Sequence, residues 1–154
     1  MLAIPKPLVA EIVAHARETY PDECVGFLLA PRAAPGAADE ARRCANVQNQ
    51  LHADDPANYP RTARTAYNLG AKDLFFLDKS QRGERPVVCI YHSHIEADAY
   101  FSAEDRRFAV QDGALVYPVE YLVVSVYDGE PRAANLFRWN ETRGDFDEAP
   151  IALG

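Results

Sequence analysis

Two histidines and an aspartate in the middle of the chain have the residue types and spacing of a metal-binding set. His92 and His94 are two residues apart, and Asp105 follows the second histidine by eleven residues. Two imidazole nitrogens and a carboxylate are typical zinc ligands, and three protein ligands leave the fourth tetrahedral position open for water. An open position is typical of a catalytic zinc ion. The pattern therefore predicts one zinc ion per chain that activates water.

Strand geometry supports this grouping. The histidines end the strongest strand candidate of the chain, and side chains two residues apart on a strand lie on the same face. We therefore expect His92 and His94 to share a face with Val88 and Ile90. Cys89 has the opposite parity, so it is expected to be a small buried apolar residue rather than a ligand.

The aspartate stands at the expected start of a helix, which gives it an ordinary alternative role. Ser102-Ala103-Glu104-Asp105 resembles a capping box, and acidic residues are favoured in the first turn of a helix. The preceding histidine pair favours the ligand role for Asp105. Ser102 could cap the helix and also donate a hydrogen bond into the metal site.

A hydrolytic zinc site also needs a general base, and three glutamates are candidates. Glu96 and Glu104 are near the ligands in sequence, but both are interpreted as solvated acids of a loop and a helix start. Glu23 begins a buried apolar run, where a carboxyl group is costly unless it has a function. On position alone, a solvated acid in the preceding turn is an equally good interpretation of Glu23. Of the other two histidines, His15 is expected to pack in the core, and His52 lies in an irregular loop that could contact substrate.

Composition limits the classes of function. The 154 residues carry a net charge of −7, with acidic residues spread along the chain and no block of Lys or Arg. This argues against binding to nucleic acid and to an anionic membrane surface. Three cysteines without a Cys-x-x-Cys pair argue against a disulfide framework and favour the cytoplasm. No apolar run has the length of a signal peptide or a membrane span.

The elements that must position these residues alternate between helix and strand along the chain. Hydrophobic periodicity and turn residues predict helices over 7–19, 70–81 and 102–111, strands over 24–30, 42–50, 64–69, 86–92, 120–127 and 132–139, and irregular segments over 31–40 and 51–63. Asp128-Gly129 is a strong hairpin signal between the last two strands. The order favours an α/β fold, a mixed sheet flanked by helices, in one domain over 1–154. The long segment 51–63 is typical of a functional flap.

The combined pattern resembles the JAMM (MPN+) metalloprotease family. The resembling residues are His92-x-His94-x7-Ser102-x2-Asp105 and an upstream Glu23 in Pro-Asp-Glu-Cys-Val-Gly-Phe-Leu-Leu, and the resemblance covers roughly residues 5 to 140. It implies a cytidine-deaminase-like fold in which the two histidines and the aspartate bind zinc. Glu23 would polarise the bound water and act as acid and base, and Ser102 would hydrogen-bond the oxyanion.

One departure from the family pattern narrows the expected substrate. Most members have proline after the second histidine, and this chain has Ile95. Ser93-His94-Ile95 with Ala99-Tyr100-Phe101-Ser102 is similar to small bacterial JAMM peptidases of sulfur metabolism. The resemblance implies hydrolysis after the C-terminal Gly-Gly of a ubiquitin-like sulfur-carrier protein, releasing cysteine or a C-terminal extension. The carrier tail would bind extended, beside a sheet edge.

Three alternatives differ in what they require. A deubiquitinase-like isopeptidase would use the same site on other ubiquitin-like conjugates. A non-catalytic MPN binding scaffold would have lost zinc ligands, whereas this chain retains all three together with Glu23 and Ser102. A base deaminase of similar fold needs a Pro-Cys-x-x-Cys signature, which the chain lacks. The sequence leaves a homodimer open.

Overall fold

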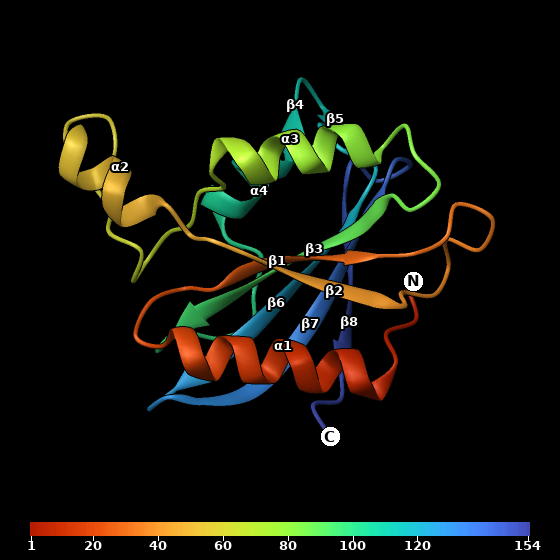
Figure 1. The fold of residues 1–154 in the computed structure, drawn as a ribbon, viewed down its shortest axis with the longest axis horizontal. Coiled ribbons are helices and arrows are strands. Elements are labelled where there is room, and N and C mark those ends of the chain that lie inside the picture. The colour runs from red at the N-terminus through yellow and green to blue at the C-terminus, as the bar shows by residue number, and fades with distance from the viewer.

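A mixed six-stranded sheet forms the centre of the computed structural model, which describes residues 1–154 (Figure 1). In spatial order its strands are β2 (Glu40–Cys44), β1 (Val25–Leu29), β3 (Val87–Ile95), β6 (Glu120–Tyr127), β7 (Glu130–Asn140) and β8 (Asp145–Ile151). The central pair, β3 and β6, is parallel and every other pair is antiparallel. The fold prediction of a mixed sheet is therefore confirmed.

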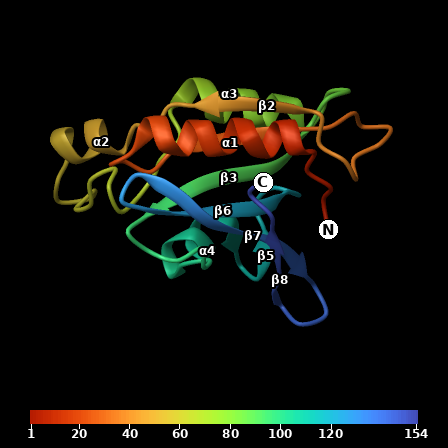
Figure 2. The same ribbon diagram turned by 90° about the horizontal axis from the view of Figure 1, so that it is seen from below.

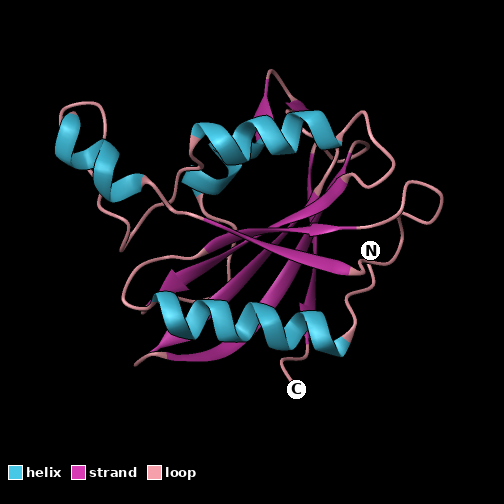
Figure 3. Ribbon diagram, viewed as in Figure 1, coloured by secondary structure: helices cyan, strands magenta, loops and turns pink.

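Helices cover both faces of this sheet. The helices are α1 (Lys6–Thr19), α2 (Gln48–Asp54), α3 (Ala71–Ser80) and α4 (Ala103–Ala109), and a small hairpin of β4 (Val110–Gln111) and β5 (Ala114–Leu115) follows α4. Helix α1 packs on one face, called here the α1 face, and α3 and α4 pack on the other, the α4 face (Figures 1 and 2). Helix α2 projects from the body of the molecule (Figure 3). None of these helices has both the length and the apolar character that crossing a membrane requires.

Alternation along β1 divides the core into two layers. Val25 and Phe27 join the apolar cluster that contains Leu77 of α3, whereas Leu28 joins the cluster that contains Ile12 of α1. Strand β1 is buried on both faces, as a strand inside a three-layer structure must be. The same alternation on β3 decides which face receives the histidines.

A bulge in the pairing of β1 with β3 corrects one expectation. Leu28 pairs with Cys89 and Leu29 pairs with Val87, so Val88 has no partner across the ladder. As a result Val87 packs in the same cluster as Ile90, while Val88 packs against the opposite cluster. The prediction that Val88 shares a face with Ile90 is wrong, because an extra residue in a bulge reverses the parity before it.

Two predicted strands are also wrong. Strand β2 ends at Cys44 and α2 begins at Gln48, so 42–50 is not one strand and α2 extends into 51–63. Segment 64–69 forms only an isolated bridge, between Leu69 and Asn46. Its backbone is held by a side chain instead, because Asn46 donates to the carbonyl of Ala66 and accepts from the amide of Asn68.

The predicted helices and the terminal hairpin agree with the structure more closely. Helices over 7–19 and 70–81 correspond to α1 and α3, and Asp128 and Gly129 have the positive φ angles of a tight hairpin turn. The helix predicted over 102–111 ends at Ala109, because Val110-Gln111 pairs with Ala114-Leu115. Strand β8 was not predicted: it is an edge strand with three acidic residues and a proline, a composition that suits an unpaired edge.

Candidate metal centre

The end of β3 and the start of α4 bring the three predicted ligands together. His92 Nε2 lies 3.0 Å from Asp105 Oδ1, and His94 Nε2 lies 3.2 Å from Asp105 Oδ2. The two Nε2 atoms are 3.2 Å apart, and all three residues are buried. His92 and His94 share a face of the sheet, as strand parity predicted, and Asp105 of α4 lies against both.

The geometry of this set fits a tetrahedral zinc ion. Zinc–nitrogen bonds of about 2.0–2.1 Å with tetrahedral angles place two ligand atoms about 3.3 Å apart, close to the separation of the two imidazole nitrogens. His94 Nδ1 lies 2.9 Å from the carbonyl oxygen of Asp98. Because a carbonyl only accepts, His94 donates from Nδ1, and the lone pair of its Nε2 faces the other ligands.

Asp105 combines the two roles that its position allowed. Its Oδ2 accepts a hydrogen bond from the amide of Ser102 at 2.9 Å, and its amide donates to Ser102 Oγ at 3.0 Å, which completes a capping box for α4. Burial disfavours the charge of Asp105, but the adjacent imidazoles of His92 and His94 outweigh this effect and hold the pKa of its carboxyl far below its usual range. Ser102 accepts from one amide and retains a hydroxyl hydrogen to donate.

Glu23 lies beside this set because β1 is antiparallel to β3. Val25 pairs with His92, and the amide of Ser93 donates to the carbonyl of Cys24 at 3.1 Å, so the register continues and sets Glu23 level with His94. The side chain of Glu23 is buried, 5% exposed, so its interpretation as a solvated acid is wrong. Its carboxyl has no hydrogen-bond or ion-pair partner, and burial, followed by the charge of Asp105, raises its pKa to about 9.

The other candidate acids and histidines have different surroundings. Glu96 is exposed and accepts hydrogen bonds from the Tyr20 hydroxyl and the Asp128 amide, and Glu104 is exposed and pairs with Arg107. His15 is packed in the core, with Nδ1 2.8 Å from the Tyr91 hydroxyl. His52 Nδ1 lies 2.7 Å from the carbonyl of Tyr59, so this histidine holds the loop and does not line the cleft described below. Cys89 is fully buried on the α1 face, as expected.

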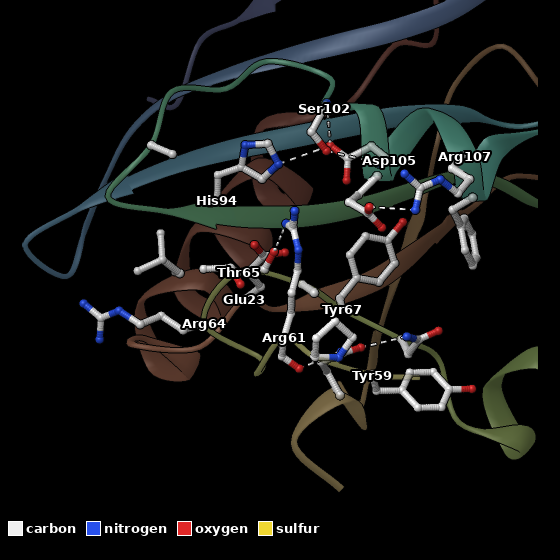
Figure 4. A pocket seen from close by; sticks show the side chains of 18 of the residues that line it. Glu23, Tyr59, Arg61, Arg64, Thr65, Tyr67, His94, Ser102, Asp105 and Arg107 are labelled. Carbon is white, nitrogen blue, oxygen red and sulfur yellow. Dashed lines mark hydrogen bonds and ion pairs between the residues drawn. The ribbon is translucent and has the colours of Figure 1, made fainter. Parts of the chain in front are cut away.

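A cleft of about 810 Å³ opens over the candidate centre (Figure 4). Glu23, His94, Ser102 and Asp105 line it on the side of the sheet and α4. The facing wall is the irregular segment 57–68. The irregular segment predicted over 51–63 covers only the first half of this wall, and the second half lies in the segment that was predicted as a strand.

Two side chains of that wall were not singled out from the sequence. Arg61 and Arg64 both line the cleft and form no ion pair. Their position in the sequence could have indicated them, because they are the only Lys or Arg residues in segment 55–70, which connects α2 and α3. Tyr67, also in this wall, packs its ring 4.6 Å from the ring of His92. Its hydroxyl is buried without a hydrogen-bond partner, as are the Tyr121 hydroxyl and His92 Nδ1.

The fold and the site together define an α/β protein with a candidate metal centre at the end of a central strand. Residues 5–140 match the family described as prokaryotic homologs of the JAB domain, and the chain belongs to this family. It is 30% identical over 153 residues to CysO-cysteine peptidases of Mycobacterium tuberculosis and Mycobacterium bovis, covering 98% of this chain and 90% of each relative.

Solved structures show the same fold. A protein from Desulfitobacterium hafniense superposes with a TM-score of 0.67 at 22% identity, covering 99% of this chain and 92% of that one. A protein from Salinibacter ruber gives a TM-score of 0.62 at 25% identity, covering 97% and 90%. A JAB1/MPN domain protein from Archaeoglobus fulgidus gives 0.53 at 15% identity, covering 95% and 94%. These likenesses support the JAB/MPN fold of this chain.

Proposed function

We propose that the protein is a zinc-dependent peptidase that hydrolyses the bond after the C-terminal Gly-Gly of a ubiquitin-like sulfur-carrier protein. The observation that carries the proposal is the unpaired, buried carboxyl of Glu23 in the same cleft as three converging ligand atoms. Burial raises the pKa of this carboxyl far above its usual range, so it binds a proton more readily than an exposed carboxylate and is suited to accept and return one. Similarity to the CysO-cysteine peptidases supports the substrate class.

Each residue of the site has a distinct task in this proposal. His92, His94 and Asp105 hold the zinc ion, which when bound supplies a Lewis acid and a water of lowered pKa. Glu23 takes the proton of the attacking water and later delivers it to the leaving nitrogen. Ser102 donates its free hydroxyl hydrogen to the carbonyl oxygen as negative charge develops there.

The surroundings of the site suit a narrow, extended tail. Tyr100 is 53% exposed at the edge of the cleft, and its ring meets that of His94 edge-on at 5.0 Å between centroids. An exposed aromatic ring beside the reacting bond covers a glycine backbone without steric conflict. The three cysteines are free and buried, which agrees with a reducing compartment. We therefore propose that the protein acts in the cytoplasm. We also propose that residues 1–154 act as a single domain.

The test uses ubiquitin-like carriers from the same genome, each with a C-terminal extension after Gly-Gly. Mass spectrometry after incubation with the zinc-loaded protein should show a carrier ending in Gly-Gly, and Glu23→Gln should remove this product while retaining zinc. Cleavage by Glu23→Gln at the rate of the unchanged protein would exclude Glu23 as the base. Protein that contains no zinc as purified and stays inactive after zinc addition would instead indicate a binding scaffold.

A further inference from the structure

Arg61 and Arg64 give the cleft two positive charges that form no ion pair within the protein. Arg107, on the opposite wall, is paired with Glu104 at 2.7 Å, but neither Arg61 nor Arg64 has a carboxylate partner. In a chain with a net charge of −7, acidic partners are plentiful, and most other arginines of the surface have found one. Unpaired arginines inside a cleft therefore point to an anionic group on the ligand.

The two arginines face different parts of the cleft. Arg61 extends toward His94 and Glu23, whereas Arg64 points away from them (Figure 4). Burial and the charge of Asp105 raise the pKa of Glu23, and the charge of Arg61 opposes part of this rise. The Arg61 guanidinium is therefore close enough to this carboxyl to interact with it. Hydrogen bonds from Tyr20 and Asp128 lower the pKa of Glu96, and the charge of Arg64 lowers it further. Arg64 thus interacts with Glu96, whereas Arg61 interacts with Glu23.

The backbone that carries Arg61 is held in place by polar side chains. The buried Gln48 donates to the carbonyl of Arg61 at 2.9 Å and accepts from Asn68 at 2.7 Å. Asn49 accepts from the amide of Ala63 at 2.8 Å. The Arg61 guanidinium donates one hydrogen bond, from Nη1 to the carbonyl of Thr65 at 3.3 Å. Its remaining N–H donors are free to bind a ligand.

The chemistry of the proposed reaction identifies that ligand group. Glu23 must deliver its proton to the leaving nitrogen, so the leaving residue lies beside Glu23. In a C-terminal amino acid the carboxylate is attached to the same carbon as this nitrogen. In a lysine side chain released from an isopeptide bond, the leaving nitrogen carries no nearby carboxylate. A planar guanidinium is the side chain best matched to a carboxylate.

We propose that Arg61 binds the free α-carboxylate of the residue that leaves, and that this contact selects a C-terminal residue over an isopeptide-linked lysine. The proposal rests on the hydrolase function proposed above and narrows its substrate class. Hydrolysis adds water across the bond, leaving the carrier with a Gly-Gly carboxylate and the released residue with a free amine and its own carboxylate on Arg61.

The test compares two forms of one carrier ending in Gly-Gly-Cys, one with a free C-terminal carboxylate and one with a carboxamide. With the zinc-loaded protein, kcat/KM for the free acid should exceed that for the amide by about tenfold or more, as expected for a charge-assisted pair. Arg61→Gln should slow the acid far more than the amide, so that the ratio of their kcat/KM values falls to about one. Arg64→Gln, the matched control, should preserve the difference.

A binding measurement separates this proposal from the hydrolase function. Zinc-loaded Glu23→Gln should bind the acid form about tenfold more tightly than the amide form, and the double variant with Arg61→Gln should bind both alike. Acid-selective binding without cleavage by the unchanged protein would support the carboxylate site and overturn the hydrolase. Equal affinity for acid and amide, or no binding of either, would overturn the role of Arg61, as would an Arg61→Gln variant that slows both substrates equally.

Discussion

Both faces of the central sheet bury histidine side chains, but the surroundings of these side chains differ. On the α1 face, His15 is 7% exposed and its Nδ1 lies 2.8 Å from the hydroxyl of Tyr91. Burial, reinforced by Arg43, lowers the pKa of His15 to about 4, so this histidine is neutral at pH 7. Gly26 leaves room for the Tyr91 ring, because a Cβ at that position would lie 2.2 Å from it. The buried histidine of this face thus has a hydrogen-bond partner within the protein.

On the α4 face several buried polar groups have no hydrogen-bond partner. His92 is fully buried and its Nδ1 has no hydrogen-bond partner. Asp105 keeps its charge between two imidazoles, and Glu23 has no partner for its carboxyl. Buried carboxylates are normally paired, so two of them beside two imidazole nitrogens, with no cationic side chain bonded to either, suit a bound cation at this place. The difference between the faces is thus a difference between a packed core and a site built for a ligand.

The largest effect should come from removing a ligand on the α4 face. Asp105→Asn replaces the charged ligand, so zinc binding and cleavage should both fall to background, a loss of more than about a thousandfold in rate. Zinc per chain, measured by atomic emission, checks the prediction. His15→Gln is the control on the α1 face and should retain one zinc per chain. Full zinc content in Asp105→Asn would exclude Asp105 as a required ligand.

The next effect concerns the unpaired carboxyl. Glu23→Gln removes the proton acceptor but no metal ligand, so kcat should fall by about 10²–10⁴ while zinc content stays unchanged. Single-turnover kinetics on an extended carrier measures the loss in the chemical step. If the variant instead lost its zinc, Glu23 would belong to the metal-binding set and not to the proton-transfer step.

Ser102 should separate chemistry from helix capping. Ser102→Ala should reduce kcat by about 10²–10³ because the oxyanion loses a donor. It should also lower the free energy of unfolding by about 1 kcal/mol, because alanine cannot cap α4. Ser102→Gly should lose the same rate with only a few tenths of a kcal/mol in stability, as measured by urea unfolding. Equal rates for serine and glycine would leave capping as the only role of this hydroxyl.

On the α1 face a substitution should change stability and leave the metal centre intact. Gly26→Ala puts a methyl group 2.2–2.5 Å from atoms of the Tyr91 ring, so the ring must shift. Overpacking of this kind typically costs about 1–3 kcal/mol. Urea unfolding should show this loss, and zinc per chain should remain as in the unchanged protein. A fall in zinc affinity would show that the two faces are coupled through β1.

The last difference between the faces is a pH dependence of stability carried by His15. Its pKa in the folded protein is lowered to about 4 from 6.5, mainly by burial, so between these values the unfolded chain binds the proton first. The contribution of His15 to stability is therefore complete above pH 6.5 and is lost as the pH falls toward 4. His15→Gln lacks this loss. The urea midpoints of the unchanged protein and of His15→Gln are measured at pH 7 and at pH 4.5, with a chelator present to remove metal. The titration of Glu23 has the opposite sign but is common to both proteins. The difference between their two pH-dependent changes in midpoint therefore reports on His15 alone.

The sequence could predict the site residues whose positions depend on a single strand or on the start of a single helix. The parity of β3 brought His92 and His94 to one face, and the serine and aspartate of a helix start predicted both the cap and the position of Asp105. The burial of Glu23 follows from its place before β1, although position alone could not separate a buried carboxyl from a solvated one.

The features that were missed depend on contacts between distant segments. Nothing in the local periodicity of 64–69 indicates that Asn46 would satisfy its backbone in place of a neighbouring strand. The direction of Arg61 depends on Gln48, and the position of Val88 depends on a bulge that no turn residue marks. Side-chain hydrogen bonds and bulges of this kind arise from tertiary pairing, which a single sequence does not display.

The proposed hydrolysis depends most on a zinc ion with an open coordination position on the α4 face. Anomalous diffraction at the zinc edge, on crystals of protein purified without a chelator, tests it directly. We predict one peak within bonding distance of His92 Nε2, His94 Nε2 and the carboxylate of Asp105, with a fourth, non-protein ligand facing Glu23. The absence of a peak at this position, or a fourth protein side chain that closes the coordination sphere, would contradict the account.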